Sequence, residues 1–210
     1  MRIAIYGKLR AGKSAVATVI KENLIDCAYF EFGDAVQEVL DVLYPQEKGV
    51  KNRKLLVGVG QHMRKYDENV WVNVIKHKIE SCTNENILVA GVRQQNEYDM
   101  LKKLGFKFIQ VEACETTRIE RCLELGDNFD KDALRNHTEM VLDSFENDYL
   151  ILNERGFKEL EISTRNILAD MVLREWQKRG LVENFKVGKV KINGYNIPKI
   201  EGFKVSETEV

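Results

Sequence analysis

The sequence has no excess of basic residues, because 32 Lys and Arg residues stand against 33 Asp and Glu residues, for a net charge of -1. A protein that wraps duplex nucleic acid usually carries a strong basic excess. The balance therefore excludes a broad nucleic-acid-binding face, and no nucleic acid is expected as a partner. Any contact with a polyanion is expected in a local pocket.

Cysteine and histidine are also few. There are three histidines, and none of the four cysteines forms a C-x-x-C pair, at Cys27, Cys82, Cys114 and Cys122. Closed zinc sites need closely spaced thiolates and imidazoles, so the sequence excludes such a site. It also lacks an apolar run of bilayer-crossing length and an N-terminal signal-peptide stretch. These absences predict a cytoplasmic protein with reduced cysteines and no membrane partner.

Apolar segments typical of buried strands alternate with segments of helical periodicity over most of the chain. The expected strands are 2–6, 28–32, 87–90, 106–112 and 149–152. The expected helices are 13–24, 33–45, 52–64, 69–82, 94–104, 116–125, 138–145 and 157–178. This alternation predicts an α/β layer fold with a parallel sheet that helices cover on both faces.

Two segments differ from this alternating pattern. The charged stretch 126–136 belongs to a region, about 115–137, that we interpret as a lid, although a plain solvated connection explains its charge as well. After Gly180 the composition changes, and residues 189–197 alternate around Asn193-Gly194, which is typical of a β-hairpin. We therefore expect a main domain over 1–180 and a C-terminal extension with a hairpin appendage over 181–210.

One motif carries the chemistry. It matches the phosphate-binding pattern G-x-x-x-x-G-K-[ST] and reads Gly7-Lys8-Leu9-Arg10-Ala11-Gly12-Lys13-Ser14. The glycines let successive backbone N–H groups point at phosphate oxygens, and the following helix adds the positive end of its dipole. Lys13 is expected to reach the β- and γ-phosphates of ATP, and Ser14 to bind Mg²⁺. The motif follows an apolar strand and precedes an amphipathic helix, which predicts a P-loop NTPase three-layer sandwich.

The class of P-loop protein follows from what else is present. The sequence has no N-K-x-D motif of a GTPase, and its central strand ends in Ala90-Gly91-Val92-Arg93 instead of the Asp-Glu of motor ATPases. A basic residue at this place suits a kinase that must align two phosphorylated substrates. Further candidates for that task are Arg10, Arg64, Arg118 and Arg121. Each of these four has an ordinary surface position as its alternative, whereas Arg93 lies where open α/β sheets bind ligands.

Several segments together resemble the deoxynucleoside monophosphate kinases of bacteriophages. They cover roughly residues 1 to 165 and comprise the P-loop, Lys54 to Arg64 with Asp67 and Val70 to Asn73, Val92-Arg93 with Asn96-Glu97, and His137-Thr138-Glu139 with Leu142-Asp143 and Asp148-Tyr149. The resemblance implies a five-stranded parallel sheet of order 2-3-1-4-5 with a substrate arm and a lid. It also implies deoxynucleotide biosynthesis, in the cytoplasm of a host cell if the chain is phage-encoded.

The activity that the resemblance implies is transfer of the ATP γ-phosphate to a deoxynucleoside 5'-monophosphate, with Mg²⁺. Lys13 and Arg93 would be catalytic. The acceptor would contact Arg93 and Arg64 as well as Asp34, Trp71 and Glu97. Asp34 has a helix N-cap as its alternative role, and Trp71 a place in the core.

The sequence departs from this family at Gly91, where the family carries the aspartate of D-V-R. That carboxylate helps to hold Mg²⁺ through water, so Asp34 or Glu97 is expected to reach the same waters. Two alternatives stay open: a kinase of another small phosphorylated metabolite, and a nucleotide-binding regulatory protein with little turnover. A homodimer also stays open as a partner arrangement.

Overall fold

The computed structural model describes residues 1–50, 52–125, 140–180, 186–192 and 195–201. The chain forms two compact units, Met1–Glu154 and Arg155–Val210. The expected lid segment 126–136 lies outside the described residues, and the division expected at residue 180 stays a prediction. Among the helices that the structure describes, none is long and apolar enough to cross a membrane.

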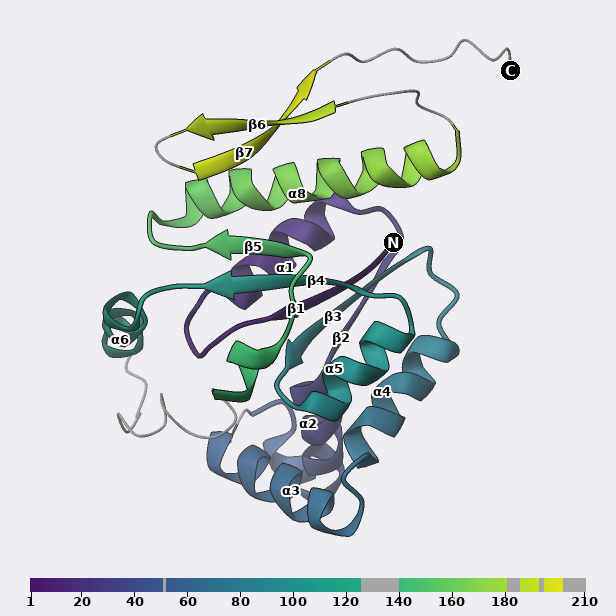
Figure 1. Ribbon diagram of the computed structural model, residues 1–210. Helices are drawn as coiled ribbons and strands as arrows, with labels where there is room; N and C mark the ends of the chain where they lie inside the picture. Colours follow the sequence, from purple (N-terminus) through teal and green to yellow (C-terminus); the bar gives the residue numbers. More distant parts are fainter. Residues whose placement is uncertain (51, 126–139, 181–185, 193–194, 202–210) are drawn as a thin grey trace. The chain divides into compact units, whose positions relative to one another are not determined.

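The first unit contains one sheet of five strands, all parallel, in the order β2-β3-β1-β4-β5 (Figure 1). The strands are β1 (Arg2–Tyr6), β2 (Cys27–Glu31), β3 (Asn86–Val92), β4 (Lys107–Glu112) and β5 (Tyr149–Leu152). This confirms the fold expected from the sequence. Strand β3 runs two residues past the predicted end at Ala90, so Gly91 lies inside the strand.

Helices follow the strands as the sequence predicts. They are α1 (Lys13–Asn23), α2 (Phe32–Leu43), α3 (Arg53–Tyr66), α4 (Val70–Glu80), α5 (Gln95–Lys103) and α6 (Glu115–Glu124), with 3-10 turns η1 (Pro45–Glu47) and η3 (Leu142–Ser144). The helix expected over 138–145 falls partly outside the described residues, and its described part ends in the 3-10 turn η3.

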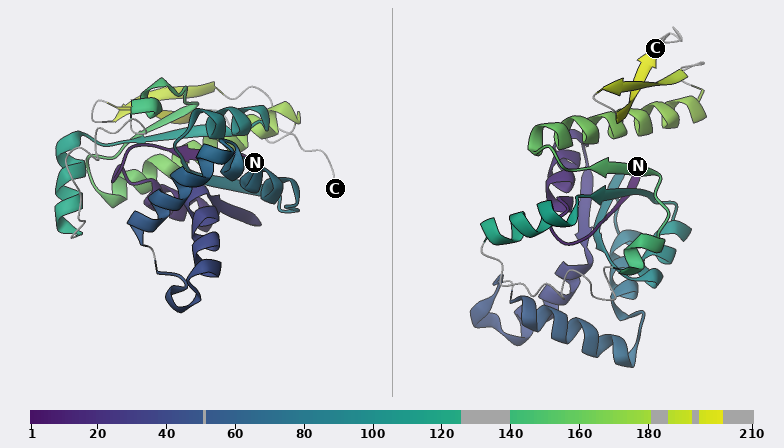
Figure 2. Two further views of the ribbon diagram at one scale, coloured as in Figure 1. Left: turned by 90° about the horizontal axis from the view of Figure 1, so that it is seen from below. Right: turned by 60° about the vertical axis from the view of Figure 1, so that its left-hand side comes forward.

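The sheet separates two helical layers. Helix α1 covers one face, and helices α4 and α5 cover the other (Figures 1 and 2). Strand residues that alternate along the chain serve the two faces, as in Ala4 and Tyr6, which belong to the core with α4 and α5. Helix α3 packs on α2 and α4. The carboxyl ends of β1, β3 and β4 therefore meet beside the P-loop.

The second unit consists of α8 (Phe157–Lys178) and an antiparallel hairpin of β6 (Lys186–Ile192) and β7 (Tyr195–Glu201). Ile192 pairs with Tyr195, so the two strands flank the Asn193-Gly194 pair around which the sequence predicts a hairpin. Helix α8 contacts β7 within this unit.

Candidate functional site

The P-loop joins β1 to α1, and its backbone requires glycine at both ends. Gly7 has φ 152° and Gly12 has φ 108°. A Cβ atom at Gly7 would lie 2.2 Å from the carbonyl oxygen of Val111 in β4. Real Cβ atoms do not approach a backbone oxygen so closely, so only glycine lets the loop pass against β4.

The positive end of α1 faces the loop without a compensating acid, because the first turn of α1 contains no acidic residue. The ammonium of Lys13 donates hydrogen bonds to the carbonyl oxygens of Gly7 and Lys8, both at 2.8 Å. Lys13 is thereby held over the loop's own backbone. Ser14 is the second residue of α1, where its hydroxyl is suited to a cation beside bound phosphates.

Three side chains from distant segments hold the outer side of the loop. Asn153, which follows β5, donates from Nδ2 to the carbonyl oxygen of Ala11 at 2.8 Å. Arg121 donates to the carbonyl oxygens of Arg10 at 3.1 Å and of Asn153 at 2.8 Å. Arg118 is buried and donates to Leu9 at 3.4 Å. These donors hold the carbonyl oxygens of three consecutive loop residues, Leu9 to Ala11, from α6 and the end of β5.

Sequence analysis proposed Arg118 and Arg121 for aligning two phosphorylated substrates. In the structure both side chains lie beside the P-loop and donate hydrogen bonds to its backbone. A contact of either arginine with the nucleotide stays a prediction. Sequence reasoning missed Asn153. Its position directly after a predicted strand was the available signal, since the carboxyl ends of parallel strands gather at the site.

A cavity of about 440 Å³ opens beside the loop, at the carboxyl end of β4. Gly7, Lys8, Cys114 and Arg118 are among the residues that line it. Lys8 also forms an ion pair with Asp143 at 2.8 Å across the lining. The cavity has a size typical of ligand sites, and it joins the phosphate loop to the first turn of α6.

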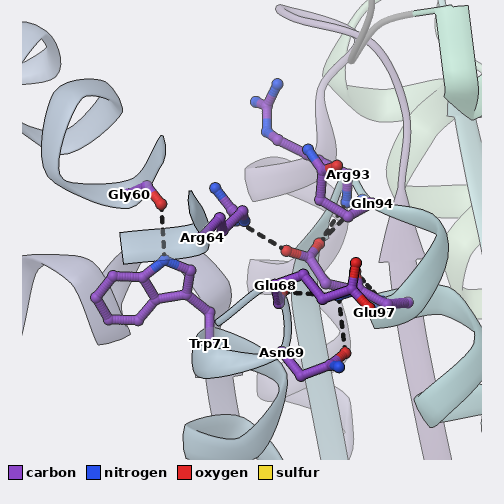
Figure 3. A network of polar contacts seen from close by, with 9 residues as sticks. Gly60, Arg64, Glu68, Asn69, Trp71, Arg93, Gln94 and Glu97 are labelled. Carbon is purple, nitrogen blue, oxygen red and sulfur yellow. Dashed lines mark hydrogen bonds and ion pairs between the residues drawn. The ribbon is translucent and has the colours of Figure 1, made fainter. Parts of the chain in front are cut away.

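A second cluster lies at the end of β3, around the carboxylate of Glu97 (Figure 3). Oε1 of Glu97 forms an ion pair with Nη2 of Arg64 at 3.1 Å. Oε2 accepts from the backbone N–H groups of Arg93 at 2.8 Å and Gln94 at 3.1 Å. The Glu97 side chain is 2% exposed and that of Arg64 is 23% exposed. Burial raises the pKa of Glu97, while the Arg93 amide and the Arg64 guanidinium oppose this shift.

Glu97 therefore lies behind the arginines and not in contact with solvent. It connects the side chain of Arg64, on α3, to the backbone of Arg93, which follows β3. The side chain of Arg93 extends away from this carboxylate (Figure 3). The two arginines that were expected to bind the acceptor are thus brought to one place by a single buried group.

Trp71 lies in the core and Asp34 lies in the first turn of α2, and a contact of Asp34 with the acceptor stays a prediction. Trp71 is 2% exposed in the core, and its indole Nε1 donates to the carbonyl oxygen of Gly60 at 3.0 Å. This is the core position that sequence analysis held as the alternative. Asp34 lies in the first turn of α2, and Glu31 occupies the N-cap position, so an N-cap role for Asp34 is wrong.

Gly91 has φ 75°, a conformation that L-residues adopt rarely. A Cβ at this position would lie 3.0 Å from Cγ and 3.3 Å from Oε1 of Glu31. Glu31 ends the neighbouring strand β2 and pairs with Ala90. Because Glu97 is engaged with Arg64, the carboxylate beside Gly91 is that of Glu31, which sequence reasoning missed. In the described part of the chain, no three His, Cys, Asp or Glu residues form a cluster that could hold a metal.

Among solved structures, TT1252 from Thermus thermophilus matches with a TM-score of 0.52 and 16% identity, over 80% of this chain and 96% of its own. Shikimate kinase from Aquifex aeolicus gives 0.50 and 21%, over 83% and 98%. Shikimate kinase from Acinetobacter baumannii, in complex with shikimate, gives 0.51 and 14%, over 82% and 93%. At these identities the likeness shows the fold, which is that of P-loop kinases.

A search of curated proteins finds no match to this chain. A family model described as an AAA domain matches residues 3–148, which include the P-loop, the Arg64–Glu97 pair and three of the five strands of the sheet in full. Since the match covers more than half of the chain, the protein belongs to this AAA domain family.

Proposed function

We propose that this protein is an ATP-dependent phosphotransferase whose acceptor is a deoxynucleoside 5'-monophosphate. The observation that carries the proposal is the pairing of a braced P-loop with two arginines that Glu97 brings together at the end of the adjacent strand. A kinase has to hold two polyanions in line, and positioning with charge neutralisation accounts for most of its catalysis.

On the donor side, the loop amides and the first turn of α1 bind the phosphates of ATP. Lys13 exchanges its carbonyl partners on Gly7 and Lys8 for phosphate oxygens. Mg²⁺, held with Ser14, would neutralise charge on the β- and γ-phosphates. The hydrogen bonds from Asn153 and Arg121 keep the loop in its binding shape before nucleotide arrives, which lowers the ordering cost of binding.

On the acceptor side, Arg64 and Arg93 bind the monophosphate. A guanidinium donates two parallel hydrogen bonds to one phosphate, so two arginines match a dianion well. Arg64 uses one edge for Glu97 and is partly exposed, which leaves donors for the substrate. Glu97 acts as a positioning residue for both arginines.

Two further candidates have the same fold and the same donor side. One is a kinase of another small acceptor, which the likeness in fold to shikimate kinases favours. An arginine pair would bind a carboxylate as well as a phosphate. The other is a nucleotide-binding protein with little turnover.

A coupled ADP-release assay tests the proposal. The acceptors would be dTMP, dGMP, dCMP, dAMP, modified pyrimidine monophosphates and shikimate, each at saturating Mg²⁺. Turnover with one or more monophosphates is expected. Turnover with shikimate alone would replace the acceptor, and ATP binding without turnover on any acceptor would favour the regulatory protein.

A further inference from the structure

At the carboxyl end of the sheet, the Glu31 side chain lies against the place where a side chain on residue 91 would be. Strand β3 lies between β2 and β1 in the sheet order, and Gly91 stands one residue before Val92, which pairs with Tyr6. Tyr6 is the residue before the P-loop. A side chain on residue 91 would meet Cγ of Glu31 at 3.0 Å. The bare glycine therefore gives the Glu31 side chain room beside β3, next to the strand that leads into the P-loop.

The carboxylate of Glu31 is held in place but is not neutralised. Its Oε2 accepts a hydrogen bond from the Tyr29 hydroxyl at 3.0 Å. Within the part of the chain that the structure describes, no Lys, Arg or His forms an ion pair with Glu31. Glu31 is also the N-cap residue of α2, yet its side chain makes no capping hydrogen bond. A half-buried carboxylate with this environment is suited to a cation or to its bound water.

Other nearby carboxylates are less suited. Glu97 is buried and already bonded to Arg64 and to two backbone amides. Asp34 lies within the first turn of α2, three residues beyond the strand end. Neighbouring strands lie about 4.8 Å apart, so the backbone of Glu31 is about 10 Å from β1. The Glu31 side chain lies beside the Cβ position of Gly91 on β3, and from there its carboxylate would be nearer than its backbone to a cation bound at the P-loop.

We propose that Glu31 supplies the carboxylate that orders the water shell of Mg²⁺ bound with ATP. Residue 91, near the end of β3, is glycine and has no side chain for this task. Gly91 and Glu31 would then be one paired feature, because a side chain at 91 would displace the Glu31 side chain from its observed position. This inference rests on the proposed function, since it requires that the P-loop binds ATP with Mg²⁺.

The test measures binding and not turnover. The dissociation constant of a non-hydrolysable ATP analogue is measured by calorimetry with and without Mg²⁺, for the wild type, Glu31→Gln and Asp34→Asn. Glu22→Gln, an exposed change near the far end of α1, is the matched control. The readout is the factor by which Mg²⁺ tightens binding. Glu31→Gln is expected to reduce that factor about tenfold, the weight of one hydrogen bond to a charged group.

Metal-free binding serves as the check on folding. It should be unchanged or tighter in Glu31→Gln, because a negative charge near the phosphates is removed. A full Mg²⁺ effect in Glu31→Gln, or its loss in Asp34→Asn instead, would overturn the assignment while leaving the proposed function intact. A wild type that binds no analogue under either condition would overturn both.

Discussion

Gly91 shows how one backbone angle decides what a position can carry. Its φ of 75° costs an L-residue about 1–2 kcal/mol, and a Cβ would also press on Glu31. Sequence analysis treated Gly91 as the absence of a carboxylate from the metal shell. The backbone geometry adds a second reason for glycine at this position.

Gly91→Asp should therefore lower the free energy of unfolding by about 2–3 kcal/mol, from backbone strain and overpacking together. Urea unfolding followed by circular dichroism measures this. Gly105→Ala is the matched control, because Gly105 has φ 78° and no atom within 4 Å of its Cβ position. If both variants lose the same free energy, contact with Glu31 contributes nothing.

Lys13 is the residue on which the donor side depends. Lys13→Ala should reduce phosphoryl transfer by at least about a hundredfold, since it removes a preorganised charge at the transferred phosphate. The assay is ADP release at saturating ATP, with a melting curve to show that the fold persists. Lys103→Ala, an exposed change on α5, should leave turnover unaltered. Near wild-type turnover in Lys13→Ala would mean that the loop has another purpose.

At the turn between β3 and α5, Glu97 contacts two arginines through different parts of each arginine. The Glu97 carboxylate forms an ion pair with the Arg64 side chain and accepts a hydrogen bond from the backbone N–H of Arg93. A substitution at Arg93 thus keeps the hydrogen bond to Glu97, whereas a substitution at Arg64 leaves a buried carboxylate without its cation. The two variants should differ in stability even if both impair the acceptor.

Arg93→Ala should raise the acceptor KM or lower kcat by about tenfold, while the KM for ATP stays the same. Arg64→Ala should do the same and also lose about 2 kcal/mol of unfolding free energy, a value reduced for its partial exposure. Steady-state kinetics and urea unfolding measure these effects. Equal weakening of ATP and acceptor by Arg93→Ala would contradict its assignment to the acceptor.

Asn153, the residue after β5, supports the P-loop through its side-chain amide. Asn153→Ala should cost about 1–3 kcal/mol of stability, because the buried carbonyl oxygen of Ala11 loses its donor. It should also weaken binding of an ATP analogue, as the loop then has to be ordered by the ligand. Asn147→Ala, which removes an exposed hydrogen bond from the amide to Gln110, is the control. Unchanged nucleotide affinity in Asn153→Ala would show that the loop holds its shape unaided.

The parts of this site that are local in sequence could be predicted, and the parts that depend on register could not. The P-loop is a contiguous motif after an apolar strand, and strand order followed from the family that the chain resembles. Glu31 meets Gly91 only because β2 pairs with β3 in a particular register. Arg118 and Arg121 share a helix face, as expected, but which group that face meets depends on how α6 packs.

Across the whole chain, the two compact units separate the P-loop from the hairpin. All the site residues discussed above lie within Met1–Glu154, as does the family match over 3–148. The hairpin of β6 and β7 belongs to the other unit. Phosphate binding should therefore not depend on the hairpin.

A chain that ends at Gly180 should keep both its melting temperature and its affinity for an ATP analogue with Mg²⁺. Differential scanning fluorimetry and calorimetry measure the two quantities. The full chain is the reference, and a chain that ends at Glu154 tests whether α8 is needed. Loss of nucleotide binding on removal of residues 181–210 would assign the hairpin to the kinase domain.

The hydrogen bonds that Asn153 and Arg121 donate to the P-loop also set an order of folding. Asn153 lies 142 residues beyond its partner Ala11, and Arg121 lies 111 residues beyond Arg10. Contacts with such long sequence separation form slowly, because a large loop must close first. During synthesis the phosphate-binding motif emerges well before its supports, which are complete only when β5 and Asn153 have been made. Nucleotide should then stabilise the folded unit and not its early folding intermediates, because it binds only after these long-range contacts have formed.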